Sequence, residues 1–220
     1  MTRNLRSLCA VLAAALALGL TTASMAGADA FTTEAVNVTV TGAQEGTDVM
    51  KVHGGEVKCT TVKYSASVTS TSSSQVTASP TFSGCTFAGL AGTINMNGCD
   101  YLLKVNTEAG NTTLTQDVVC PSGKEITITA PSVGTAKCII HIPAQTGLGP
   151  ASAANVGAGT TREVTITAAV TNMKYSQTAG TAETGNCATA DNTTGGTYTG
   201  KALLTGENFS GTTHIGIFLS

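Results

Sequence analysis

The cysteines are the feature that most constrains the fold of this chain. Cys9 lies close to the start, and the other six are Cys59, Cys85, Cys99, Cys120, Cys138 and Cys187. An exported chain with an even number of cysteines usually pairs them as disulfides. None of the six has the CxxC spacing of a redox or metal site. We therefore expect three structural disulfides.

The first 30 residues predict a signal peptide. Arg3 and Arg6 precede an apolar run over 8–20, and small residues follow. This run is shorter than the roughly 20 residues that a membrane-spanning helix needs. We expect cleavage after Ala28 or Ala30. The mature chain is then secreted and has no transmembrane segment.

Charge argues against some partners. Without Arg3, Arg6 and Asp29, the mature chain keeps nine basic and twelve acidic residues, and the basic ones are scattered. Nucleic acid requires a concentrated positive patch, so we expect no nucleic-acid partner. Tryptophan is absent and aromatic residues are 4% of the chain. A core this thin would gain from disulfides, which contribute about 2–4 kcal/mol each.

Alternation of apolar and polar residues predicts strands with one buried face. β-branched residues alternate with polar ones over 36–41, 62–68, 125–129 and 163–170. Helical periodicity is nearly absent, and no βαβ unit is visible. The sequence predicts an all-β, mostly antiparallel β-sandwich, jelly-roll-like or Greek key, formed by a single domain over 31–220.

One segment, 143–161, lacks this alternation and is rich in Gly, Ala and Pro. It is predicted to be an irregular surface loop. The alternative is two small β domains that divide near residue 150. A bridge from Cys138 to Cys187 would span the segment and favours the single domain.

Hairpin register predicts one cysteine pair directly. Strands over 99–106 and 112–120 flank the turn-like segment 108–111. A turn centred there places Cys99 opposite Cys120. Residues directly opposed in a non-hydrogen-bonded antiparallel pair have Cα atoms about 4.5 Å apart, which is within disulfide reach.

The other two pairs are predicted by less direct arguments. A turn centred near Ser72 brings Cys59 close to Cys85. Cys59 falls on the polar phase of its strand, so this pair requires a bulge or a bridge on the outer face. Elimination then pairs Cys138 with Cys187.

No motif assigns catalytic chemistry. The HExxH pattern of zinc enzymes and the GxSxG pattern of hydrolases are both absent. A convergent hydrolase site would need His141 or His214 beside Asp100, Asp117 or Asp191. Solvated histidines are the simpler interpretation, so we expect no catalytic residues and no cofactor.

Two polar segments contain the oxygen ligands that calcium prefers. They are 95–100 and 191–196, and neither has the EF-hand order. Asn, Asp and Gly are first of all turn formers. We expect no metal site, and a calcium-dependent adhesion module stays an alternative.

Several cysteine contexts resemble those of a known group of proteins. They are Cys59-x4-Tyr64, Gly84-Cys85-Thr86-Phe87, Asn97-Gly98-Cys99-Asp100-Tyr101, the segment from Cys138 to Gln145, and Tyr198-Thr199-Gly200. Together, over roughly 56–204, they resemble uncharacterised exported β-rich proteins of high-GC Gram-positive bacteria. The resemblance implies a bacterial, secreted setting and no particular activity.

These observations predict a secreted, non-catalytic protein with a structural, adhesive or ligand-binding role at or outside the cell surface. Its partner would be an extracellular or cell-envelope ligand that the sequence does not identify. A secreted hydrolase with a convergent histidine–acid site and a calcium-dependent adhesion module are the alternatives.

Overall fold

The computed structural model describes residues 30–108, 111–131, 137–178 and 190–220. All but the last residue of the predicted signal peptide therefore lies outside the described residues, as does Cys187. No helix in the described part of the chain has the length and apolar character needed to cross a membrane.

Strands make up almost all of the described chain. The first eight are β1 (Phe31–Thr33), β2 (Val38–Gln44), β3 (Asp48–Val52), β4 (Gly55–Val68), β5 (Ser72–Ser73), β6 (Gln75–Phe87), β7 (Leu90–Asn95) and β8 (Asp100–Glu108). The others are β9 (Asn111–Val119), β10 (Ile126–Pro131), β11 (Lys137–Ile142), β12 (Gln145–Val156), β13 (Glu163–Thr178), β14 (Ala190–Asn208), β15 (His214–Ile215) and β16 (Ile217–Leu219), and one 3-10 turn, η1, spans Gly159–Thr161. Neighbouring strands pair in antiparallel fashion. The predicted all-β, mostly antiparallel, sandwich-like fold is confirmed.

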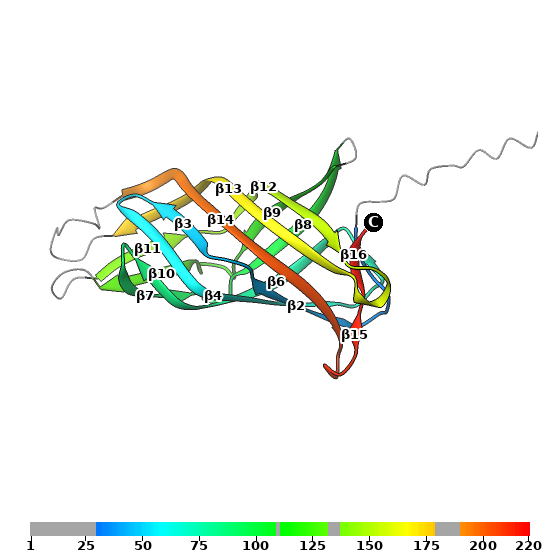
Figure 1. The fold of residues 1–220 in the computed structure, drawn as a ribbon. Coiled ribbons are helices and arrows are strands. Elements are labelled where there is room, and N and C mark those ends of the chain that lie inside the picture. Colours follow the sequence, from blue (N-terminus) through cyan, green and yellow to red (C-terminus); the bar gives the residue numbers. More distant parts are fainter. Residues whose placement is uncertain (1–29, 109–110, 132–136, 179–189) are drawn as a thin grey trace, which may run out of the picture.

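Four long strands, β4, β6, β13 and β14, run through both ends of the molecule (Figure 1). At one end β2 lies between β14 and β4, while β8, β9 and β12 lie between β6 and β13. At the other end β3 takes the place of β2, and β7, β10 and β11 take the place of the other three. Because β4 also pairs with β6, the hydrogen bonding closes into a ring at each end.

Each ring encloses its own apolar core. The first, which we name the capped core, includes Val38, Leu114 and Val164, and the small sheet β16–β1–β5 covers its end with Phe31 and Leu219. The second core is packed by residues such as Val57, Phe87, Ile128, Ile140 and Tyr175. Period-two alternation puts these side chains on the inner face of each strand.

Two disulfides join the pairs that hairpin register predicts. Cys99 and Cys120 have Cα atoms 4.1 Å apart and continue the β8–β9 register. Cys59 and Cys85 lie directly opposite each other in β4 and β6, with Cα atoms 3.9 Å apart. Both pairs are compatible with an extracellular or oxidising environment. Pairing of Cys138 with Cys187 stays a prediction, because Cys187 lies outside the described residues.

A local irregularity in β4 explains how Cys59 turns inward against the predicted phase. Cys59 and Val62 are both buried, whereas Thr60 and Thr61 between them are exposed. Opposite Thr60 lies Gly84, whose φ of 59° is in the left-handed region that favours glycine. The register is the same on both sides of this point, since Cys59 faces Cys85 and Thr61 faces Ser83. The alternation therefore shifts on both strands together, and the bridge lies inside the protein rather than on its outer face.

The segment 143–161 is largely a strand, β12, rather than the irregular loop that its composition predicts. Its pairing with β9 shifts register between Gln145 and Leu148 and again between Leu148 and Ala151. Leu148 and Ala151 are both buried although they are three residues apart. These register shifts interrupt the period-two alternation, and the sequence of this segment therefore does not show the pattern that predicts a strand.

Candidate functional site

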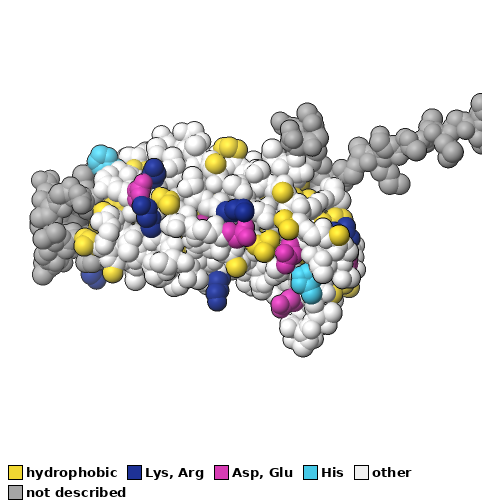
Figure 2. All heavy atoms as spheres, viewed as in Figure 1, with side chains coloured by type: hydrophobic (Ala, Val, Ile, Leu, Met, Phe, Trp, Pro, Cys, Tyr) yellow, Lys and Arg dark blue, Asp and Glu magenta, His cyan; other side chains and the backbone are white. Residues whose placement is uncertain are grey.

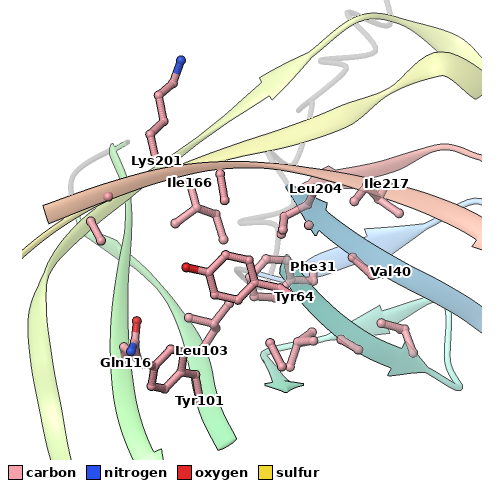
Figure 3. A pocket seen from close by; sticks show the side chains of 18 of the residues that line it. Phe31, Val40, Tyr64, Tyr101, Leu103, Gln116, Ile166, Lys201, Leu204 and Ile217 are labelled. Atoms are coloured by element: carbon pink, nitrogen blue, oxygen red, sulfur yellow. The ribbon is translucent and has the colours of Figure 1, made fainter. Parts of the chain in front are cut away.

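The capped core contains a cavity of ≈ 60 Å³. Its wall is formed by inward-facing residues of β2, β4, β6, β8, β9, β13 and β14, and the cap strands β1 and β16 close it. Most of this wall is aliphatic or aromatic and includes Phe31, Val40, Leu103, Ile166, Leu204 and Ile217 (Figure 3).

Small residues on the inner faces of adjacent strands create this space. Ala168 and Ala202 line the cavity where longer side chains would fill it. Gly42 and Gly200 also line it, but neighbouring side chains occupy the space beside them. A Cβ on Gly42 would lie 2.7 Å from Leu204 Cδ2. These glycines therefore let large side chains of neighbouring strands approach the backbone closely.

A polar cluster lies at the inner end of the cavity, and we name it the tyrosine–aspartate cluster: Asp48, Tyr64 and Tyr198. Tyr198 donates a hydrogen bond of 3.0 Å to Asp48 Oδ2, and the two tyrosine hydroxyls are 3.1 Å apart. Asp48 is only 4% exposed. Since the Tyr198 proton is directed to Asp48, Tyr64 donates the bond between the hydroxyls.

Burial dominates the electrostatics of this cluster. Burial raises the pKa of Asp48 above its ordinary value, although the hydrogen bond from Tyr198 and the nearby Lys201 backbone and Tyr64 hydroxyl partly oppose the shift. Burial likewise raises the pKa of Tyr64 and of Tyr198, so both hydroxyls keep their protons. Asp48 Oδ1 is buried and has no hydrogen bond of good geometry within the described residues.

Gln116 of β9 adds a second polar group to the same cavity. It is 9% exposed, and its side-chain amide makes no hydrogen bond to another described residue. Figure 3 shows the Gln116 amide and the Tyr64 hydroxyl directed toward the interior. An amide that faces an interior space without a protein partner favours a ligand or water that can bind it.

Two smaller cavities of ≈ 30 Å³ each lie in the second core. Tyr101 and Tyr198 line both of them and also the larger cavity. These two rings therefore separate the interior space of the capped core from that of the second core.

The histidines pair with glutamates rather than with the aspartates considered above. His141 Nδ1 lies 2.5 Å from Glu125 Oε1, and His214 Nε2 lies 3.7 Å from Glu163 Oε1. Ser176 is opposite His141 in the β11–β13 register, yet no hydrogen bond joins their side chains in the described structure. Neither of these two residues lines the three cavities above. This arrangement lacks the positioned nucleophile that a hydrolase needs.

The candidate acids have other partners. Asp100 accepts a hydrogen bond of 2.7 Å from Ser79 Oγ. Asp117 lies 2.5 Å from Lys104 Nζ and also accepts from the Gly147 amide at 2.8 Å. Burial raises the pKa of Asp117, but these two contacts outweigh it and hold that pKa below its usual value. The side chain of Asp191 lies outside the described residues.

The two calcium-like segments also have structural explanations where they are described. Asn95 Oδ1 accepts a hydrogen bond of 2.9 Å from the Asn97 amide, and Asn97 has a φ of 51°, both typical of a tight turn. Within the described residues, no group of three or more His, Cys, Asp or Glu is placed to hold a metal ion. The segment 191–196 forms part of β14, and the side chains of 191 and 192 lie outside the described residues.

The molecular surface carries scattered charge rather than one strong patch on the face that Figure 2 shows. Comparisons of the chain with protein-family models, with curated proteins and with solved structures give no match. Reasoning about function therefore starts from the cavity and its polar end.

Proposed function

We propose that this chain is a secreted, non-catalytic binding protein that holds a small, mainly apolar ligand in the cavity of the capped core. The observation that carries the proposal is a space of ≈ 60 Å³ with an aliphatic wall and a polar inner end. An apolar pocket with a few convergent polar groups is the usual form of a small-molecule site.

The energetics of the cavity support a ligand. At about 24 cal/mol per Å³, an empty space of this size reduces stability by roughly 1.4 kcal/mol. Replacing Gly42 by a larger residue would require repacking of the neighbouring strands, because an added Cβ would lie 2.7 Å from Leu204 Cδ2. A ligand that fills the space recovers the lost dispersion contacts.

The size of the cavity restricts the ligand. An engineered cavity of about 150 Å³ binds benzene, and the cavity here is less than half that volume. The space is too small for a ring or a long chain, so it restricts the ligand to about two or three non-hydrogen atoms. The cap strand β1 adds Thr32 and Thr33 to the wall at the outer end of the cavity.

The secreted setting rests on two supports. The first 30 residues have the pattern of a signal peptide, and the two disulfides suit an oxidising environment. The ligand is accordingly one that the protein meets at or outside the cell surface.

Ligand uptake by a matched pair of variants tests the proposal. Ala168 lines the cavity and Ala169, the next residue of β13, is exposed on the outer face. Titration of the mature chain with xenon as a small apolar probe, followed by NMR, should show saturable binding. Ala168→Leu should abolish that binding, and Ala169→Leu should leave it unchanged. Equal binding by both variants, or none by the parent chain, would contradict the proposal.

A further inference from the structure

We propose that the cap strand β1 is the gate of the cavity, through which a ligand enters and leaves when β1 separates from its neighbours β16 and β5. Phe31 of β1 forms part of the cavity wall, so a movement of this strand opens the cavity directly (Figure 3). This inference rests on the proposed function, because it concerns the route to the same cavity.

The walls of the cavity offer no easier route. The strands around it form a closed hydrogen-bonded ring, so a ligand passes between two of them only by breaking a ladder. β2, for example, has seven residues and pairs with β14 along its whole length. At the inner end, the rings of Tyr101 and Tyr198 lie between the cavity and the second core. The capped end is therefore the end with the least backbone pairing.

The irregular seams of the ring lie beside the second core. The β9–β12 register shifts at Leu148, and the β13–β14 register first shifts after Val170, and both of these residues pack in the second core. The Asp117 carboxylate also joins β9 to β12, because it accepts a hydrogen bond of 2.8 Å from the Gly147 amide. These seams therefore do not open the capped core.

β1 is held by short ladders. β1 and β16 have three residues each, and β5 has two. One further backbone pair joins Ala30 and Ser220, with N–O distances of 3.4 and 3.1 Å. Next to β1, Glu34 Oε1 lies 2.8 Å from Arg162 Nη2 in a partly exposed ion pair, which stabilises the closed state only weakly. A strand with so few hydrogen bonds can open locally while the ring stays folded.

β16 is fastened to the wall by other groups, which makes β1 the strand that moves. The Asn155 side chain of β12 donates to the Leu219 carbonyl at 2.9 Å and accepts from the Leu219 amide at 2.7 Å. The Ile217 amide donates to the Arg162 carbonyl at 3.0 Å. The Arg162 guanidinium also lies 3.7 Å from the centroid of the Phe218 ring.

A disulfide between β1 and the last residue tests the gate. Thr32 Oγ1 lies 2.9 Å from Ser220 Oγ in an exposed contact, so cysteines at these positions are within disulfide reach. We name Thr32→Cys/Ser220→Cys the gate disulfide. The control disulfide is Thr41→Cys/Thr205→Cys, since these hydroxyls lie 3.0 Å apart on the paired wall strands β2 and β14.

Xenon exchange, followed by NMR of the mature chain, measures the opening rate. The gate disulfide should slow xenon exchange about tenfold or more and leave the affinity unchanged, because a gate alters entry and exit by the same factor. The control disulfide should leave both the rate and the affinity unchanged. Parental exchange in the protein with the gate disulfide, or equal slowing by the control disulfide, overturns the gate and leaves the binding function standing.

Amide hydrogen exchange tests the gate in the parent chain without a ligand. The Thr33 amide, which donates to the Thr71 carbonyl at 3.0 Å, should exchange about tenfold or more faster than the amides of β2. Exchange of Thr33 only together with β2, by global unfolding, overturns the gate. Failure of the parent chain to take up xenon overturns the proposed function, and the exchange of Thr33 then still decides whether β1 opens.

Discussion

Gly200→Ala tests how the polar end of the cavity is held together. A Cβ at this position would lie 2.4 Å from Asp48 Oδ1 and 2.6 Å from the Tyr198 hydroxyl. Both contacts are too close for the side chains to stay where they are. Asp48 is buried between neighbouring strands, so its displacement breaks the 3.0 Å bond from Tyr198.

The expected cost follows from three effects. Leaving a buried hydrogen-bonding group unpaired costs about 1–3 kcal/mol, and overpacking costs about 1–3 kcal/mol. Replacing a glycine within a strand by alanine returns roughly 0.5–1 kcal/mol. We expect Gly200→Ala to lower the free energy of unfolding by about 2–4 kcal/mol. For a chain of this length, the melting temperature would fall by roughly 4–16 °C.

Urea unfolding followed by circular dichroism measures this change, with Gly195→Ala as the control. Gly195 lies on the same strand, and an added Cβ there would have no neighbour within 4 Å. The control should be as stable as the parent chain or slightly more stable. A Gly200→Ala protein with parental stability would refute the claim that this glycine is needed for the close approach of Asp48.

Three further predictions concern stability. Replacing Cys99 and Cys120 together by alanine removes a disulfide that closes a loop with a sequence separation of 21. The free energy of unfolding, measured in urea, should fall by about 3 kcal/mol. A loss below about 1 kcal/mol would contradict this prediction. The raised pKa of Asp48 means that the folded state binds the Asp48 proton more tightly than the unfolded state does. The contribution of Asp48 to stability therefore falls as pH rises from about 4 through the folded-state pKa. Asp48→Asn should remove this fall, and parallel pH profiles of stability for the parent chain and the variant would disprove it. The lowered pKa of Asp117 has the opposite effect: its contribution to stability is present near neutral pH and is lost as pH falls. Lys104→Met should therefore lower the free energy of unfolding by about 1 kcal/mol near neutral pH and much less in acid, where the Asp117 carboxyl is protonated. A loss independent of pH in thermal melts would count against the ion pair.

The strands and two of the disulfides could be predicted because their determinants are local. The β8–β9 turn fixes the register that places Cys99 opposite Cys120. One turn therefore determines the pairing of two residues that are far apart in sequence. The inward direction of Cys59 could not be read from alternation. It depends on the irregularity at Thr60, and Gly84 on another strand accommodates it.

The cavity could not be predicted because it depends on which strands face one another across the interior. Asp48, Tyr64 and Tyr198 come from β3, β4 and β14, and each looks like an ordinary strand residue in its own segment. Gly200 offered a weak signal, since a glycine inside a strand often marks a close backbone approach. Its partner Asp48 lies about 150 positions away and could be identified only once the β14–β3 pairing was known.

The most direct measurement of the central claim is an NMR titration of the isotope-labelled mature chain with xenon, a probe small enough for the cavity. The account predicts saturable shifts confined to amides around the cavity on β2, β4, β13 and β14, and their loss in Ala168→Leu but not in Ala169→Leu. Shifts spread over the outer surface, or shifts that persist in Ala168→Leu, would contradict a binding site inside the capped core.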